Sequence, residues 1–382
     1  MSIESRKPIR VLQVVRPAAG GMKGHVLQLS VGLRSHGFEC EIACPGDSEL
    51  VHDALEANIT VHPVPIVGPL DPLRDPLAII SLAEIIRERR PALVHAHGSK
   101  AGLIARMAVL LAGRPPVIVT VHNQVLYGGI SPLMRRVYIA MERRLAHRTA
   151  RIITVSEALR AEMTDVFCLS SRLVTTVYNG LDLAPFVAGG DRAASRKRHG
   201  IPPDALAIGL AARFAPQKGL DLLVEAAVPV LEGDSDAVLV LAGAGPLLEV
   251  VKTTARATSV RDRILFPGIE TDMPGLLSAL DIYASAAIAE GLGLGTIEAM
   301  AAGLPVASTT AGGTPEVVDD GVTGLLVAPG KAAPLTAALR RLVKDPALRR
   351  RMGEAGRVLA IERFTEDRML ARTAEVYREV LG

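Results

Sequence analysis

The chain is 382 residues long, which exceeds what one hydrophobic core usually serves, so the sequence predicts two domains and excludes a single small binding module. Hydrophobic residues make up 49%, charged residues 22% and aromatic residues 3%, which excludes global disorder and disfavours a site built on aromatic stacking. The net charge of +3 combines +5 over residues 1–188 with −2 over the remainder, and we find no extended basic footprint of a nucleic-acid binder.

Short apolar runs alternate with segments of helical periodicity along the first half of the chain. Strands are predicted at residues 11–15, 41–44, 93–95, 117–121, 151–155 and 173–177, and helices at 26–36, 76–90 and 101–111. The first run follows Arg6, Lys7 and Arg10 but is short and ends at Arg16, so it predicts a strand rather than a signal peptide. This alternation predicts a parallel sheet covered by helices on both faces.

One segment of the first half combines basic and apolar residues at roughly helical spacing. Its members are Arg135, Arg136, Arg143, Arg144 and Arg148 with Leu133, Met134, Val137, Tyr138, Ile139 and Met141. Two interpretations stay open: a solvated helix face, or contact with an anionic membrane surface.

The cellular location is inferred from cysteines and hydropathy. Cys40, Cys44 and Cys168 match no zinc or redox spacing, which fits a reducing compartment. The longest uncharged stretch, residues 115–134, contains His, Asn, Gln, Gly and Pro, so no transmembrane helix is predicted. We therefore expect a cytoplasmic protein, at most peripheral at the inner face of the membrane.

The strand and helix pattern restarts in the second half, after a segment rich in Gly, Ala and basic residues. Strands are predicted at residues 207–211, 237–242, 263–266, 282–284 and 305–308. We therefore predict a linker near residues 183–203 and two doubly wound domains, over residues 1–188 and 189–364, whose parallel sheets face a shared cleft. A final helical segment covers residues 365–382, and its periodicity does not say which domain it contacts.

Two loops that follow first strands carry features of an anion site. Gly20 and Gly21 precede a helix, where free N–H groups and the helix dipole favour an anion, although a plain tight turn explains them about as well. Arg213 and Lys218 follow the first strand of the second domain and could clamp a diphosphate; the alternative is two ordinary surface charges. The chain has neither a dinucleotide fingerprint nor a Walker loop.

The most informative segment contains two glutamates separated by seven residues, Glu290 and Glu298, around a glycine-rich helix start. Gly291, Gly293 and Gly295 expose backbone N–H groups there, and a carboxylate can accept two hydrogen bonds from paired sugar hydroxyls. Two such glutamates also occur by chance on solvated helices, and it is the glycines that favour a site.

Three histidines lie at predicted strand ends. His95 and His97 could be metal ligands, but no carboxylate or Cys of suitable spacing completes a set, so no metal is expected. His122 follows the strand at 117–121 and is the better candidate for the cleft, although an isolated His is more often structural.

Taken together, these motifs resemble the family 4 retaining glycosyltransferases over nearly the whole chain and in the family's order. The resemblance rests on Gly20-Gly21, Val94-His95-Ala96-His97, His122, Asn179-Gly180-Leu181-Asp182, Arg213 with Lys218, Gly243-Ala244-Gly245-Pro246, Glu290 with Glu298, and Gly303-Leu304-Pro305-Val306. One departure is Leu292, where the family commonly has Phe.

The resemblance implies a GT-B fold, a nucleotide-sugar donor held mainly by the second domain, and no metal or other cofactor. It implies that Arg213, Lys218 and the N–H groups of Gly20 and Gly21 hold the donor diphosphate, and that Glu298 binds the ribose. It further assigns the donor sugar to Glu290, to the N–H groups of Gly291, Leu292, Gly293 and Leu294, and to His122, with the base near Phe266 and Gly268. The C-terminal helix typically crosses back to the first domain.

We therefore expect a retaining hexosyl- or N-acetylhexosaminyl-transferase that uses a nucleotide sugar, with UDP as the expected nucleotide, and a glycan or lipid-linked acceptor in surface polysaccharide synthesis. Two alternatives stay open: a UDP-sugar epimerase of the same fold, and a nucleotide-sugar-binding protein without catalysis.

Overall fold

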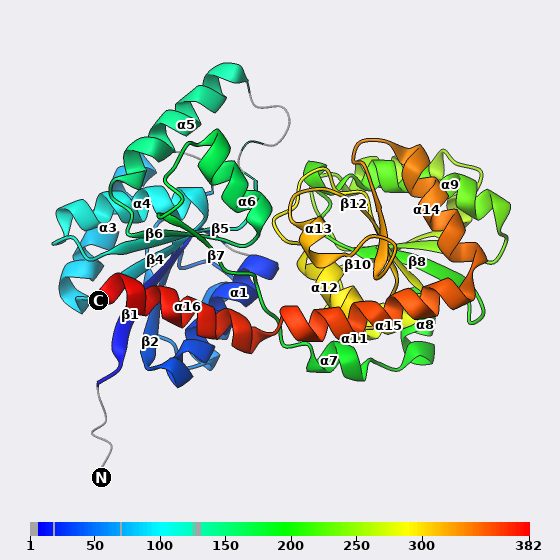
Figure 1. Cartoon of the computed structure of the whole chain (residues 1–382), viewed down its shortest axis with the longest axis horizontal. Coiled ribbons are helices and arrows are strands. Elements are labelled where there is room, and N and C mark those ends of the chain that lie inside the picture. Colours follow the sequence, from blue (N-terminus) through cyan, green and yellow to red (C-terminus); the bar gives the residue numbers. More distant parts are fainter. Residues whose placement is uncertain (1–6, 18–19, 69–70, 125, 127–130) are drawn as a thin grey trace, which may run out of the picture. The chain divides into compact units, whose positions relative to one another are not determined.

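The structure, a computed structural model, describes residues 7–17, 20–68, 71–124, 126 and 131–382 and forms two compact units (Figure 1). The first unit contains the chain up to Gly180 together with Glu366–Gly382, and the second is Leu181–Thr365. Residues 181–188, which the sequence analysis assigned to the first domain, belong to the second unit.

The first unit is built on a sheet of seven parallel strands in the order β3-β2-β1-β4-β5-β6-β7. The strands are β1 (Ile9–Val15), β2 (Phe38–Cys44), β3 (Val61–Pro63), β4 (Leu93–His97), β5 (Val117–Val121), β6 (Arg151–Thr154) and β7 (Val174–Thr176). The sequence predicts six of these strands. It misses the edge strand β3, whose three residues are too few to show a periodicity.

Helices cover both faces of this sheet (Figure 1). They are α1 (Gly21–Gly32), η1 (Leu33–His36), α2 (Leu50–Glu56), α3 (Arg74–Arg89), α4 (Gly98–Leu111), α5 (Pro132–Ala146), α6 (Glu157–Ala161), η2 (Glu162–Val166) and α16 (Glu366–Leu381). Leu12 and Val14 point from β1 into the core under α3 and α4, whereas Val11 packs on the opposite face with α16. Alternate residues of a buried strand thus serve two cores.

The C-terminal helix α16 is part of the first unit. Its buried residues Met369, Leu370, Ala374 and Tyr377 join the core that contains Leu29, Leu33 and Val11. An added Cβ at Gly32 would lie 2.3 Å from the Leu370 side chain, so the glycine allows α1 and α16 to pack closely. Two segments far apart in the sequence therefore share one hydrophobic core.

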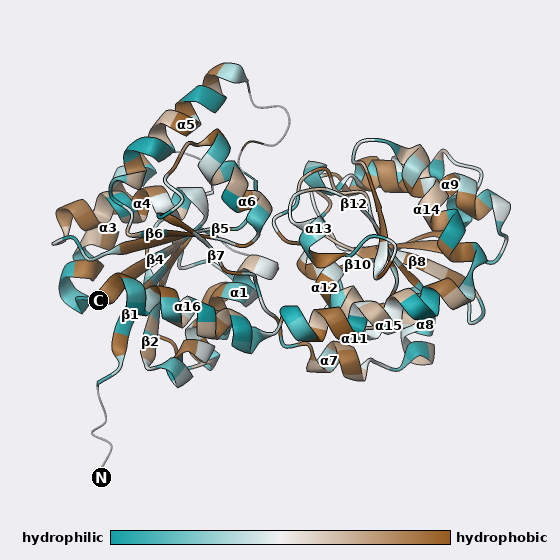
Figure 2. Ribbon diagram, viewed as in Figure 1, coloured by the Kyte–Doolittle hydropathy of each residue, from teal (hydrophilic) through white to brown (hydrophobic). Residues whose placement is uncertain are grey.

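The second unit repeats the architecture with six parallel strands in the order β10-β9-β8-β11-β12-β13. They are β8 (Leu206–Ala211), β9 (Ala237–Ala242), β10 (Ile264–Gly268), β11 (Ile282–Ser285), β12 (Val306–Thr309) and β13 (Gly324–Val327). The sequence analysis did not predict β13. Figure 2 shows the apolar character of the strands in both sheets, which is expected for parallel strands covered on both faces.

The helical elements of the second unit surround this sheet. They are α7 (Ala184–Ala188), α8 (Arg192–His199), η3 (Pro216–Lys218), α9 (Leu220–Gly233), α10 (Leu248–Arg256), η4 (Arg261–Arg263), α11 (Met273–Ala279), α12 (Leu294–Ala301), α13 (Thr314–Val317), α14 (Ala332–Lys344) and α15 (Pro346–Arg363).

The segment predicted as a linker, residues 183–203, is instead helical and packed, so that prediction is wrong. Arg196 of α8 is only 4% exposed and donates to the carbonyls of Pro202, Pro203, Ala205 and Ala279 as well as to a carboxylate. The basic run suggested a solvated segment, but a guanidinium with five donors can be buried when carbonyls satisfy it.

In both sheets the strand order reverses beside the first strand. The reversal lies between β1 and β4 in the first unit and between β8 and β11 in the second. Ligands of open parallel sheets bind at such switch points, beyond the carboxyl ends of the strands. The loops after these four strands are therefore where a site is expected.

Candidate functional site

In the second unit, the loops after β8 and β11 are hydrogen-bonded to each other. The N–H of Ile288 donates to the carbonyl of Gln217 at 2.9 Å, and an added Cβ at Gly219 would lie 2.2 Å from the carbonyl oxygen of Ala286. Gly219 also has a φ of +56°, a conformation that favours glycine. Lys218 and Glu290 are therefore held on two loops that are fixed against each other.

Lys218 and Glu290 form an ion pair in which the Nζ and Oε2 atoms are 2.5 Å apart. Both side chains are partly buried, with exposed fractions of 26% and 16%. Arg213 lies in the same loop as Lys218 and is exposed. The structure thus brings together a lysine and a glutamate that are separated by 72 positions in the sequence.

The backbone of Glu290 lies so close to Gly312 that position 312 has no room for a side chain. Gly312 has a φ of +53°, and an added Cβ would lie 1.7 Å from the carbonyl oxygen of Glu290. The N–H of Gly313 donates to the carbonyl of Gly291 at 3.1 Å. The loop after β12 therefore supports the glycine-rich segment from behind.

Helix α12 begins directly after this glycine-rich segment. Gly293 precedes it with a φ of +97°, and no side-chain bond caps the helix among the described residues. The N–H of Thr296 donates to the carbonyl of Gly293 at 2.9 Å, so the N–H groups at the very start of the helix, those of Leu294 and Gly295, are the ones that can bind a ligand. The side chain of Leu292 is buried, which leaves its backbone as the group that it can offer. The three residues 291–293 connect Glu290 to this helix start.

Glu298 lies on α12 and is partly buried. Burial raises the pKa of its carboxyl group to about 7. Tyr283 of β11 is fully buried beneath the site, and burial together with the charges of Glu298 and Glu290 raises the pKa of its hydroxyl group. An added Cβ at Gly295 would lie 2.7 Å from that hydroxyl oxygen, so the first turn of α12 rests on Tyr283.

Phe266 and Gly268 lie on β10, two strands away from β8. Gly268 accepts a hydrogen bond from the N–H of Gly243 at 2.6 Å, and the ring of Phe266 lies 6.4 Å from that of Phe214. Gly268 is thus connected to the loop after β9, whereas Phe266 lies against the loop after β8, which also contains Arg213 and Lys218.

In the first unit, Gly20 and Gly21 open helix α1. The sequence predicted this helix from residue 26, but it starts at Gly21, with Gly20 at a φ of +58°. No described side chain caps it, so its first N–H groups remain available to an anion. Two further residues of this predicted loop, Ala18 and Ala19, lie outside the described residues.

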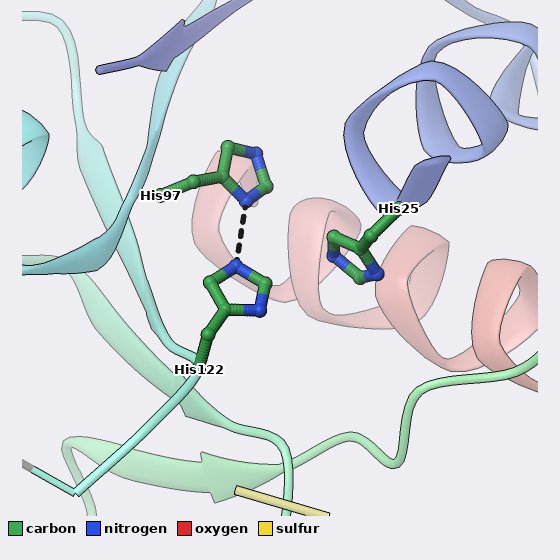
Figure 3. A group of neighbouring side chains, drawn as sticks. All are labelled: His25, His97 and His122. Atoms are coloured by element: carbon green, nitrogen blue, oxygen red, sulfur yellow. Dashed lines mark hydrogen bonds between the residues drawn. The ribbon is translucent and has the colours of Figure 1, made fainter. Parts of the chain in front are cut away.

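Three histidines of the first unit meet beside the switch point (Figure 3). His25 comes from α1, His97 from β4 and His122 from the end of β5, and a ligand atom of each lies within 4.8 Å of the others. The His97 Nδ1 and His122 Nε2 atoms are 3.1 Å apart. Burial, as the largest cause, holds the pKa of all three rings below the usual value, so the rings are neutral near pH 7.

Sequence spacing missed this cluster and the residues behind it. The sequence analysis singled out neither His25 nor the pair Gln13 and Tyr377, although Gln13 and Tyr377 are fully buried and hydrogen-bonded to each other. A detectable signal was present: Gln13 is the one polar residue inside the apolar run 11–15. A buried amide in such a run needs polar partners.

Helix α5 carries the basic and apolar segment. Leu145 is its one buried residue among those the structure describes there, while Leu133, Met134 and Val137 are 70%, 42% and 49% exposed. Arg143 donates to the carbonyl of Phe167, so not every arginine faces solvent freely. Within the described ranges, no helix is long and apolar enough to cross a bilayer.

Each of the two units matches a known protein family. Residues 19–185 match the family described as Glycosyltransferase Family 4, and residues 191–359 match Glycosyl transferases group 1. The chain is 30% identical over 395 residues to a D-inositol 3-phosphate glycosyltransferase of Actinosynnema mirum, with 94% of each chain covered. It is 26% identical to a UDP-Gal:alpha-D-GlcNAc-diphosphoundecaprenol alpha-1,3-galactosyltransferase of Escherichia coli, covering 91% of this chain and 90% of that one.

Solved structures show the same fold. The structure of Anabaena Alr3699/HepE in complex with UDP and glucose matches with a TM-score of 0.85 at 21% identity, covering 97% of this chain and 99% of that one. Two parallel-sheet units of seven and six strands and this likeness confirm the expected GT-B fold. The chain therefore belongs to the family 4 glycosyltransferases, with a group 1 glycosyltransferase unit as its second half.

Proposed function

We propose that this protein transfers a sugar from a UDP-sugar to a glycan or lipid-linked acceptor, in the assembly of surface polysaccharide or glycoconjugates. The observation that carries the proposal is the grouping of Lys218, Glu290 and the uncapped start of α12 at the switch point of the second unit. Two relatives support the donor: one is named for UDP-Gal, and the solved Anabaena protein is in complex with UDP and glucose.

The donor diphosphate is bound by cations and N–H groups in this proposal. Arg213 supplies a planar fork and Lys218 a point charge, and both stabilise the charge that develops as the nucleoside diphosphate leaves. The N–H groups of Gly20 and Gly21 contribute to the same phosphates. Because Lys218 already pairs with Glu290 at 2.5 Å, one lysine would connect the phosphate and the sugar parts of the donor.

The sugar and ribose hydroxyls are bound by the two glutamates. Glu290 and the N–H groups of residues 291–294 bind the transferred sugar, and Glu298 binds the paired ribose hydroxyls. The base lies near Phe266 and Gly268. His122 contacts the sugar close to the anomeric carbon.

We further propose that transfer retains the anomeric configuration and needs no metal. The bond from the anomeric carbon to the phosphate oxygen breaks while a bond to the acceptor oxygen forms on the same face. The acceptor's hydroxyl proton passes to the departing phosphate oxygen. The carboxylate pair of glycosidases is not required, because no protein nucleophile is attached to the sugar in this scheme.

The acceptor side is assigned to the first unit and its helix α5. Leu133, Met134 and Val137 with the arginines of α5 give an exposed face that is both apolar and basic. Such a face suits contact with an anionic membrane surface, where a lipid-linked acceptor resides. We propose peripheral contact of this kind at the inner face of the membrane.

A transfer assay with purified protein tests the proposal, after a thermal-shift screen of UDP-, GDP- and ADP-sugars selects the donor. Lys218→Ala should lower turnover by about a hundredfold, as loss of one charge-stabilising group typically does. Glu298→Ala removes a group that binds the ribose, so it should raise the KM for the donor and lower kcat/KM. Lys252→Ala, a surface lysine paired with Glu249, is the matched control and should turn over normally.

Several outcomes would contradict parts of the proposal. Undiminished turnover in the Lys218→Ala variant would refute the site, and an inverted linkage would refute retention. Loss of transfer in chelator, restored by a divalent cation, would refute metal independence. A new UDP-sugar formed without acceptor would indicate an epimerase, and tight donor binding without any turnover would indicate a binding protein.

A further inference from the structure

The first unit contains a continuous chain of buried polar side chains that ends at His122. Starting from the sheet core, the chain runs through Thr120, His95, Tyr377, Gln13, His97 and His122. The first five of these residues are at most 2% exposed. Buried polar groups at this depth are costly unless each is hydrogen-bonded, so the order of donors and acceptors along the chain is constrained.

Gln13 fixes which atoms donate and which accept along this series of hydrogen bonds. Its Nε2 group donates to the hydroxyl oxygen of Tyr377 at 3.1 Å and faces the Sγ atom of Cys40 at 3.5 Å. Its Oε1 atom lies 2.8 Å from the Nε2 atom of His97. An amide oxygen only accepts, so His97 must carry its proton on Nε2.

The same donor and acceptor reasoning fixes the roles of the His97 Nδ1 and His122 Nε2 atoms. A neutral imidazole carries one N–H, so the Nδ1 atom of His97 is an acceptor. The atom that faces it at 3.1 Å is the Nε2 atom of His122, which must therefore be the donor. Burial holds the pKa of both rings well below the usual value, so neither ring carries the second proton that would relax this rule.

We infer that Gln13, His97 and Tyr377 are positioning residues that hold His122 in its Nε2–H tautomer and leave the Nδ1 lone pair as an acceptor for a sugar hydroxyl. The sugar ligand in this inference rests on the proposed function. The tautomer of His122 does not, because it follows from the hydrogen bonds. Figure 3 shows the second ring nitrogen of His122 pointing away from His97. His122 would thus accept a hydrogen bond from the donor sugar rather than deliver a proton to it.

A metal ion between the three histidines fits the geometry less well. Imidazole nitrogens around tetrahedral zinc lie about 3.3 Å apart, given Zn–N bonds of about 2.0 Å. Here the ligand atoms lie within 4.8 Å of one another, and the His25 ring meets His97 and His122 edge-on, at 72° and 78°. The 3.1 Å separation of His97 and His122 is that of a hydrogen bond.

The tautomer can be measured directly by nitrogen–proton NMR on the full-length protein with 15N-labelled histidine. The resonances of His122 are assigned by their loss in a His122→Ala sample. We expect a protonated Nε2 and an unprotonated Nδ1 for both His97 and His122. The reverse pattern, or an averaged one, would overturn the inference, and so would a stoichiometric change of both rings on adding zinc.

Two variants separate this role from a merely structural one. Tyr377→Phe removes the acceptor that orients the Gln13 amide, so His122 should show averaged tautomers and kcat/KM should fall about fivefold to tenfold, as for one lost hydrogen bond. Cys40→Ala removes only the weak sulfur contact at 3.5 Å and should leave both the spectrum and the rate unchanged. A rate loss in Tyr377→Phe with an unaltered His122 spectrum would overturn the inference.

The NMR result also separates this inference from the proposed function. The expected tautomer in a protein that transfers no sugar would refute the function and leave the hydrogen-bond chain standing. Normal transfer by a protein whose His122 carries its proton on Nδ1 would refute the inferred order of hydrogen bonds and leave the proposed function unaffected.

Discussion

The raised pKa of Glu298 predicts that donor affinity depends on pH near neutrality. Burial raises this pKa from 4.5 to about 7, so the carboxyl group is about nine-tenths ionised at pH 8 and about one-tenth ionised at pH 6. The ionised form accepts two hydrogen bonds from ribose hydroxyls, whereas the protonated form loses part of that capacity. If only the ionised form binds well, the Kd for the donor should rise about tenfold from pH 8 to pH 6, or about 1.4 kcal/mol.

Isothermal titration calorimetry with UDP-glucose at pH 6, 7 and 8 and constant ionic strength measures this effect. A UDP-sugar is preferable to UDP, because a terminal phosphate itself titrates near pH 6. His122 does not confuse the result, since burial keeps its pKa well below this range. Glu298→Gln should bind weakly and equally at all three values. An affinity that is flat in the unmodified protein, or equally pH-dependent in Glu298→Gln, would refute the argument.

The remaining predictions concern stability, measured by urea unfolding. Gly312→Ala should cost about 3 kcal/mol or more, because its Cβ would lie 1.7 Å from a carbonyl oxygen; Gly321→Ala, with a similar φ of +77° but open space, should cost only about 1–2 kcal/mol. Arg196→Met should cost about 3–5 kcal/mol, whereas Arg198→Met, at an exposed ion pair, should cost at most about 1 kcal/mol. The raised pKa of Glu298 means that its ionisation destabilises the folded protein as the pH rises from 5 to 8. Glu298→Gln lacks this titration, so in the absence of donor its stability relative to the unmodified protein should increase over that range, by at most about 3 kcal/mol. Equal costs within either matched pair, or a gain in the opposite direction, would contradict these arguments.

The fold was predictable because parallel strands covered on both faces leave continuous apolar runs. The run at 117–121 coincides with β5, and that at 237–242 coincides with β9. The start of α1 was not predictable in this way, because glycines at positions 21 and 24 resemble a loop although both are helical. The helix α8 was missed for a similar reason: its basic run conceals Arg196, whose burial depends on carbonyls that the sequence does not show.

The candidate site of the second unit was partly predictable because its residues come from glycine-rich loops with recognisable chemistry. What the sequence could not give is the contact between Lys218 and Glu290, since it arises from backbone bonds between two loops. The contribution of Tyr283 was also hidden, because an aromatic residue in a short strand is usually core. The structure shows its hydroxyl group directly beneath Gly295, where it supports the first turn of α12.

The polar chain of the first unit shows the limit of local patterns most clearly. Gln13 interrupts an apolar strand, and its partner Tyr377 lies 364 positions later on a helix whose periodicity predicted a helical segment but not what it contacts. Folding brings them together because α16 completes the core over β1, and the sheet then places His95 and His97 on the face beneath it. A C-terminal helix that packs here therefore affects more than stability: through Tyr377 and Gln13 it fixes which nitrogen of His97, and then of His122, carries a proton. Shortening α16 before Tyr377 should accordingly disturb His122 even though its own loop is unchanged.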